Sequence, residues 1–100
     1  MWGNKKKKKS ILIVGGFHEA SSLANSLLEK EYRVTIVNKN YADCEKLAEI
    51  NKLNVIYGDG SKKFILEDAD AASCQVAIAL TGSDETNLII CEMCKEFFHV

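Results

Sequence analysis

The chain has 100 residues, of which 47% are hydrophobic and 27% are charged, so it has room for one folded domain and is not intrinsically disordered. No apolar run approaches the roughly 18 residues that a membrane-spanning helix needs. The apolar run Ile11–Val14 is also too short for the core of a secretory signal. Composition therefore predicts a cytoplasmic protein without a direct membrane span.

The charge is unevenly distributed along the chain. Lys5–Lys9 form a basic run, whereas residues 10–100 hold eight basic and fourteen acidic residues, a net charge of −6. A body this acidic excludes general nucleic-acid binding. We interpret residues 1–9 as a Lys-rich leader and residues 10–100 as a single domain. The leader is either a solvated segment or a contact to anionic lipid at the inner face of a membrane.

The first half of the domain alternates between strand and helix patterns. Ile11–Val14 reads as a buried strand that ends at a glycine pair. An amphipathic helix follows, with its apolar stripe on Ala20, Leu23, Ala24, Leu27 and Leu28. Val34–Val37 is the second strand. The pattern then predicts a helix over Tyr41–Ile50, whose buried side carries Cys44, Leu47 and Ala48.

The second half repeats the alternation. We expect a strand at Asn54–Tyr57, a short helix near Ser61–Asp68, a strand at Val76–Leu80 and a last helix over Asp84–Phe98. Four strand–helix units predict a parallel sheet with right-handed crossovers. The predicted fold is an α/β, Rossmann-like open sheet of four strands in the order 3-2-1-4, with helices on both faces.

The last helix is apolar over much of its circumference. One stripe holds Ile90, Met93, Cys94, Phe97 and Phe98, and it is widened by Leu88, Ile89 and Cys91. This pattern favours either association of the molecule through the helix or a domain shortened at its C-terminus. Cys91 and Cys94 fit this apolar pattern as reduced, packed thiols, and we predict no metal site.

Polar, mostly glycine-containing segments follow each predicted strand. Because ligands of open parallel sheets bind outside the carboxyl ends of the strands, these segments are the candidate site. The candidate residues are Gly15, Gly16, Phe17, His18, Asn38, Lys39, Gly58, Asp59, Gly60, Ser61, Thr81, Gly82 and Ser83. No catalytic residue is predicted, because the chain offers no positioned acid or base beside a substrate pocket.

Two motifs resemble one family. Gly58-Asp59-Gly60-Ser61 and the segment from Ser73 to Asn87 are similar to the TrkA-N family, also called KTN or RCK N-terminal domains. The resemblance runs from about Ser10 to Val100. It implies a cytosolic nucleotide-binding regulator of potassium transport that binds NAD(H) or ATP/ADP. It also implies a homodimer or larger ring, coupled to a potassium-translocating membrane protein.

The chain departs from the dinucleotide-binding pattern at two landmarks. Phe17 stands at the second glycine position of the Gly-x-Gly-x-x-Gly loop, where a large side chain would meet the phosphate, and Ala20 stands at the third. Asn38 replaces the acid that contacts the ribose, and Lys39 beside it could attract a phosphorylated ribose. The resemblance implies that Asp59 contacts the adenosine part of the nucleotide.

Several residues keep two interpretations. Asp59 either contacts a ligand or caps the helix that follows, and Thr81, Gly82 and Ser83 either line the cleft or cap the last helix. His18 is either a ligand contact or an inert loop residue. Three functions remain: a regulatory nucleotide-binding domain of potassium transport, which is not an enzyme; an oligomerisation scaffold of the same fold that binds no ligand; and a small NAD(P)-dependent oxidoreductase.

Overall fold

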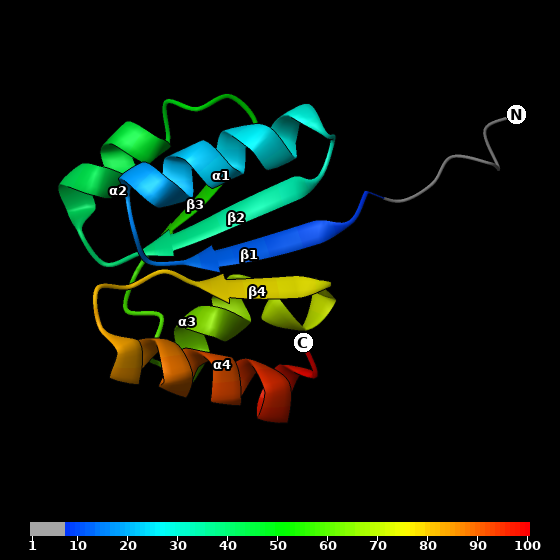
Figure 1. Cartoon of the computed structure of the whole chain (residues 1–100), viewed down its shortest axis with the longest axis vertical. Helices are drawn as coiled ribbons and strands as arrows, with labels where there is room; N and C mark the ends of the chain where they lie inside the picture. Colours follow the sequence, from blue (N-terminus) through cyan, green and yellow to red (C-terminus); the bar gives the residue numbers. More distant parts are fainter. Residues whose placement is uncertain (1–7) are drawn as a thin grey trace, which may run out of the picture.

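The computed structural model describes residues 8–100, so residues 1–7 of the predicted leader lie outside the described part (Figure 1). Strands and helices alternate as predicted. The strands are β1 (Ser10–Val14), β2 (Arg33–Asn38), β3 (Asn54–Tyr57) and β4 (Val76–Ala79). The helices are α1 (His18–Glu29), α2 (Tyr41–Leu47), α3 (Lys63–Asp68), the 3-10 turn η2 (Ala71–Ser73) and α4 (Asp84–Phe98).

The four strands form one parallel sheet in the order β3-β2-β1-β4, which confirms the predicted 3-2-1-4 order. In the central register, Ile13 of β1 lies between Ile36 of β2 and Ile78 of β4. β1 therefore has a neighbour on both sides, and Ile11–Val14 are all buried. Strands buried on both faces need continuous apolar sequence, which explains why this run lacks polar residues.

Helices cover both faces of the sheet. α1 and α2 lie on one side and α3 and α4 on the other (Figure 1). Successive side chains of β1 serve the two layers in turn, because neighbouring side chains of a strand point to opposite faces. Ile11 and Ile13 pack with Ala20 and Ala24 of α1. The opposite cluster contains Leu12, Val14, Leu66, Ile90, Cys94 and Phe98.

Several boundaries differ from the predictions: β1 begins one residue earlier, at Ser10, and β2 is longer by one residue at each end, Arg33–Asn38. α2 ends at Leu47 rather than Ile50, and Ala48 is exposed instead of buried, since the chain turns here toward Lys52 at a positive φ of 70°. α3 begins at Lys63, after a turn that Ser61 and Asp59 close by hydrogen bonds. β4 ends at Ala79, one residue before the predicted boundary.

α4 has the bounds that the sequence predicts, and it is buried along one side only. Ile90, Cys94 and Phe98 point into the core, whereas Leu88 is 61% and Phe97 is 48% exposed. Leu88, Ile89 and Phe97 therefore leave apolar surface of α4 uncovered in a single copy of residues 8–100. Within this described part, no helix has the length and apolar character needed to cross a membrane.

Candidate functional site

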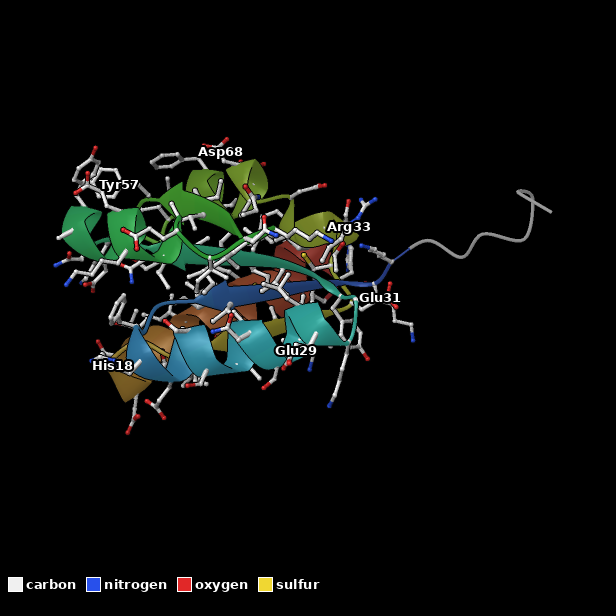
Figure 2. The ribbon with its side chains drawn as sticks, turned by 90° about the horizontal axis from the view of Figure 1, so that it is seen from above. His18, Glu29, Glu31, Arg33, Tyr57 and Asp68 are labelled. Carbon is white, nitrogen blue, oxygen red and sulfur yellow. The ribbon has the colours of Figure 1, made fainter. Side chains whose placement is uncertain are left out.

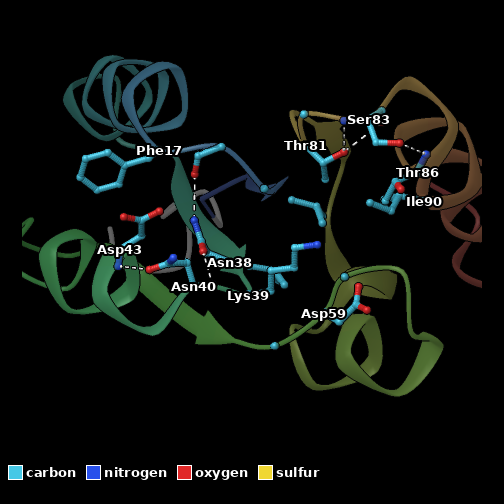
Figure 3. A pocket seen from close by; sticks show the side chains of 17 residues that line it. Phe17, Asn38, Lys39, Asn40, Asp43, Asp59, Thr81, Ser83, Thr86 and Ile90 are labelled. Atoms are coloured by element: carbon cyan, nitrogen blue, oxygen red, sulfur yellow. Dashed lines mark hydrogen bonds between the residues drawn. The ribbon is translucent and has the colours of Figure 1, made fainter.

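A cleft of about 400 Å³ lies at the carboxyl ends of the strands (Figure 3). The loops after all four strands meet there because parallel strands end at the same edge of the sheet. Eleven of the predicted site residues line the cleft: Gly15, Gly16, Phe17, Asn38, Lys39, Gly58, Asp59, Gly60, Thr81, Gly82 and Ser83. The four loops that the sequence analysis selected as the candidate site therefore lie around one cleft.

The glycine pair after β1 requires glycine at both positions. Gly15 and Gly16 have φ values of 86° and 83°, in the region that side chains rarely adopt. A Cβ atom on Gly15 would lie 2.6 Å from Cγ2 of Thr81, and one on Gly16 would lie 3.0 Å from the Leu80 carbonyl oxygen. The loop therefore passes the segment after β4 with bare backbone. The Gly15 N–H donates to the Val37 carbonyl oxygen at 2.7 Å, whereas the Gly16 N–H has no partner within residues 8–100 and is available to a ligand.

The first turn of α1 follows this loop. Phe17 occupies the position before the helix, and no side chain caps the first N–H groups. These groups carry the partial positive charge of a helix N-terminus, which favours phosphate. The Phe17 ring lies between α1 and α2, on the opposite side of the cleft from Thr81 (Figure 3). There it packs against the α1–α2 cluster, with Lys46 Nζ 5.8 Å from the ring centroid.

Asn38 at the end of β2 is only 6% exposed, and its side chain holds the glycine loop. The Nδ2 group donates to the Gly16 carbonyl oxygen at 3.0 Å, and Oδ1 accepts from the Asn40 N–H at 2.7 Å. Both ends of the amide are therefore engaged with backbone. An aspartate at this position would have no hydrogen to donate to Gly16 at neutral pH.

The β2–α2 loop contributes charge to the same wall. Lys39 lines the cleft, and Asn40 caps α2 by accepting the Asp43 N–H at 2.9 Å. The Asp43 carboxylate also lines the cleft, between Phe17 and Asn40 (Figure 3). This side of the cleft thus presents one ammonium group and one carboxylate to a ligand.

Asp59 rises from the β3–α3 turn on the opposite wall. Its Oδ1 accepts both the hydroxyl and the backbone N–H of Ser61, and these two bonds hold the pKa of Asp59 below its ordinary value. Lys62 and Lys39 act in the same direction, whereas partial burial opposes them. Asp59 is therefore a firmly ionised acceptor at the mouth of the cleft.

The loop after β4 is fixed by hydrogen bonds to α4. The Ser83 hydroxyl caps α4 by accepting the Thr86 N–H at 3.1 Å, so the capping interpretation of Ser83 holds together with its position on the cleft wall. Thr81 donates its N–H to Oδ1 of Asn87 at 2.9 Å. Gly82 has open space where a Cβ atom would stand.

Two predicted residues lie outside the cleft lining. His18 is exposed on the first turn of α1 (Figure 2), where its ring and that of Phe17 form a T-shaped pair with 4.9 Å between centroids. Ser61 does not line the cleft wall; its hydroxyl donates a hydrogen bond to Oδ1 of Asp59. The sequence analysis missed six lining residues: Val14, Val37, Asn40, Asp43, Thr86 and Ile90. The signal for most of them was adjacency to a predicted loop.

The cysteines form no candidate metal centre. Cys91 is exposed, whereas Cys94 is buried in the core. Burial raises the pKa of the Cys94 thiol, as it does for Cys44 and Cys74. Within residues 8–100, no group of three His, Cys, Asp or Glu side chains is arranged to hold a metal ion.

Solved structures share this fold. A chain titled "GsuK channel bound to NAD" superimposes with a TM-score of 0.77 at 24% identity, over 93% of this chain and 17% of that one. The "Crystal Structure of the GsuK RCK domain" gives a TM-score of 0.76 at 24% identity, over 93% of this chain and 20% of that one. At this identity the likeness supports the fold, which agrees with the predicted Rossmann-like sheet.

Sequence relatives are closer. The "Trk system potassium uptake protein TrkA" of Haemophilus influenzae is 32% identical over 89% of this chain and 19% of its own length. That of Vibrio alginolyticus is 35% identical over 90% of this chain and 20% of its own length. The "Trk system potassium uptake protein TrkA homolog" of Methanothermobacter thermautotrophicus is 34% identical over 87% of this chain and 40% of its own.

The chain thus spans between one fifth and two fifths of the length of these relatives. The family model described as the TrkA-N domain matches residues 11–100, which include all four strands except Ser10 of β1 and every residue that lines the cleft. The chain therefore belongs to the TrkA-N domain family.

Proposed function

We propose that this chain is a regulatory nucleotide-binding domain of a potassium transport system. The observation that carries the proposal is the cleft, which combines a bare glycine loop, an uncapped helix N-terminus and an ionised carboxylate on opposing walls. These are the groups that recognise a diphosphate and a sugar in open parallel sheets. Relatives that carry the name of a potassium uptake protein support the transport system.

The cleft suits NAD(H) or an adenine nucleotide. The phosphates would be held by the main-chain N–H group of Gly16 and by the first turn of α1. Lys39 would meet the ribose side, and Asp59 would accept hydrogen bonds from the adenosine. The similar GsuK channel structure, which is titled as NAD-bound, agrees with this class of ligand. Bound nucleotide would act by favouring one arrangement of the assembly over another.

The assembly itself is part of the proposal. Leu88, Ile89 and Phe97 leave an apolar strip of α4 exposed, which supports contact with a second copy or another domain. We infer a cytoplasmic homodimer or larger ring that acts on a potassium-translocating membrane protein, with a role in regulation rather than catalysis.

One observation favours the second candidate function, a scaffold of the same fold that binds no ligand. Asn38 stands where a ribose-binding acid is expected, and both ends of its amide are occupied by backbone. A nucleotide must therefore bind without a carboxylate from β2. Flat titrations with every nucleotide would support the scaffold.

Amide chemical shifts of the isotope-labelled chain would test the proposal. On titration with NAD⁺, NADH, ATP and ADP, we expect shifts at Gly15, Gly16 and Gly82, which line the cleft. Glu31 and Lys52 line a separate hollow at the opposite end of the sheet and serve as internal controls. Shifts confined to that hollow, or none with any nucleotide, would contradict the proposal.

A further inference from the structure

Asn87 stands outside the cleft lining, yet it controls one of the cleft walls. It is the fourth residue of α4, and all the hydrogen bonds of its side chain go to one residue, Thr81. Oδ1 accepts the Thr81 N–H at 2.9 Å and also the Thr81 hydroxyl, and Nδ2 donates to the Thr81 carbonyl oxygen at 3.2 Å. A single side chain therefore satisfies the donor and the acceptor of the Thr81 backbone.

Thr81 in turn touches the glycine loop. Its Cγ2 methyl group and Cα lie 2.6 and 3.0 Å from the place where a Cβ atom of Gly15 would stand. These distances put Thr81 in close contact with Gly15, so only a displacement of Thr81 away from the loop can widen the cleft here. The Thr81 hydroxyl oxygen also accepts the Ser83 N–H at 3.2 Å, which ties the β4–α4 turn to the same anchor.

The exposed apolar strip of α4 begins directly after Asn87. Leu88 and Ile89, which are 61% and 44% exposed, are its next two residues. Because a helix moves as a rigid body over one or two turns, a shift of Asn87 carries these side chains with it. A continuous chain of contacts thus runs from the glycine loop through Thr81 and Asn87 to the exposed apolar residues of α4.

We propose that Asn87 is a positioning residue of this cleft. Through its hydrogen bonds to Thr81, the binding of a ligand in the cleft changes the position of α4. Asn87 holds Thr81 against Gly15 on the wall of the cleft, and a ligand that presses on the β4–α4 turn moves α4 through Asn87. This inference rests on the proposed nucleotide-binding function, because only a ligand can press on the turn.

Hydrogen exchange without nucleotide tests the positioning contact itself. In Asn87→Ala, the Thr81 amide loses its acceptor, and we expect its exchange to become about tenfold faster, which corresponds to the loss of one hydrogen bond. Phe98→Leu is the matched control, since it loosens the core end of α4 without touching Thr81. Equal acceleration in both variants would overturn the inference, because α4 stability alone would then govern Thr81.

Titration with NAD⁺ and ATP tests the transmission. We expect about tenfold weaker binding to Asn87→Ala than to Phe98→Leu. Nucleotide should slow exchange at Leu88 and Ile89 in the native chain and in Phe98→Leu, but not in saturated Asn87→Ala. The same slowing in Asn87→Ala would overturn the inference. If the native chain binds no nucleotide, the proposed function and the transmission fail, and the Thr81 exchange rates alone decide the positioning role.

Should Asn87→Ala fail to fold, Asn87→Asp serves in its place. It keeps the acceptor for the Thr81 N–H and hydroxyl and loses only the donor to the Thr81 carbonyl. We then expect weaker nucleotide binding and a reduced α4 response while Thr81 exchange stays slow. Unchanged binding together with an unchanged α4 response would overturn the inference.

Discussion

Replacement of Asn38 by aspartate should destabilise the fold in a pH-dependent way. At neutral pH the new carboxylate has no hydrogen for the Gly16 carbonyl oxygen, which the native Nδ2 group meets at 3.0 Å. The position is 6% exposed, so water has little access to take the place of the lost donor. A buried acceptor left without its donor costs about 1–3 kcal/mol. For a domain of this size, a loss of about 2 kcal/mol lowers the unfolding midpoint by roughly 10 °C.

Acid should reverse this loss. Burial and the facing Gly16 carbonyl raise the pKa of the substituted carboxyl in the folded state above its ordinary value of about 3.9, outweighing the Asn40 N–H and the nearby Lys39. Asp43 on the same wall acts in the raising direction. Because the folded pKa is raised, the protonated carboxyl does not lower the free energy of unfolding below about pH 3.9. The carboxylate lowers this free energy increasingly as the pH rises through the folded pKa.

The assay is urea unfolding of native chain and Asn38→Asp between pH 3 and pH 8. The difference in unfolding free energy should be small at pH 3 and reach its full value near neutrality. Asn38→Leu is the matched control, since it loses both hydrogen bonds and has no group to titrate, so its difference should be independent of the titration of residue 38. An Asn38→Asp difference that stays constant with pH would refute the role assigned to Asn38.

Three further predictions concern single contacts. Gly60→Ala should lower the free energy of urea unfolding by about 1–3 kcal/mol, because its Cβ atom would press on Val14 in the core. Gly82 has open space around it, so Gly82→Ala should change this free energy by no more than about 0.5 kcal/mol. Equal losses in the two variants would contradict this geometry. Ser83→Ala should lose about 1 kcal/mol with the cap of α4, and an unchanged midpoint would refute the cap. Ser61→Ala should raise the pKa of Asp59, measured by carbon NMR; an unmoved titration would show that Ser61 is not its cause.

The sign of the Asp59 effect is opposite to that of Asn38→Asp. Its folded pKa is depressed, so its contribution to stability is present above its ordinary pKa and disappears as the pH falls through the folded value. In Ser61→Ala, the folded pKa of Asp59 moves up toward the ordinary pKa of an aspartate. The pH range over which its contribution to stability disappears therefore becomes narrower.

The sequence predicted the backbone of this fold almost completely. The apolar run Ile11–Val14 and the stripe of α1 follow from burial alone, and the right-handed crossover limits four alternating units to very few strand orders. The position of the cleft follows as well, because the carboxyl ends of parallel strands share one edge of the sheet. Only the local turns failed: α2 ends early because residues 48–52 turn toward β3.

The side-chain contacts of the cleft could not be predicted in this way. Asn38 reaches across to Gly16, and Asn87 reaches back to Thr81, and both choices depend on distances that only the assembled sheet sets. The Phe17 ring packs against the apolar residues between α1 and α2 instead of lying where a phosphate would bind. This position is favoured because it buries apolar surface. A residue type at a motif position therefore does not reveal the direction of its side chain.

Nucleotide binding is the central claim, and thermal unfolding of the chain against NAD⁺, NADH, NADP⁺, ATP, ADP and AMP tests it most directly. A ligand at 100 times its dissociation constant stabilises the folded state by about 2.7 kcal/mol. For a domain of this size that raises the unfolding midpoint by roughly 10 °C or more. The account predicts such a shift with NAD(H) or an adenine nucleotide. Midpoints that stay unchanged with all six at millimolar concentration would contradict it.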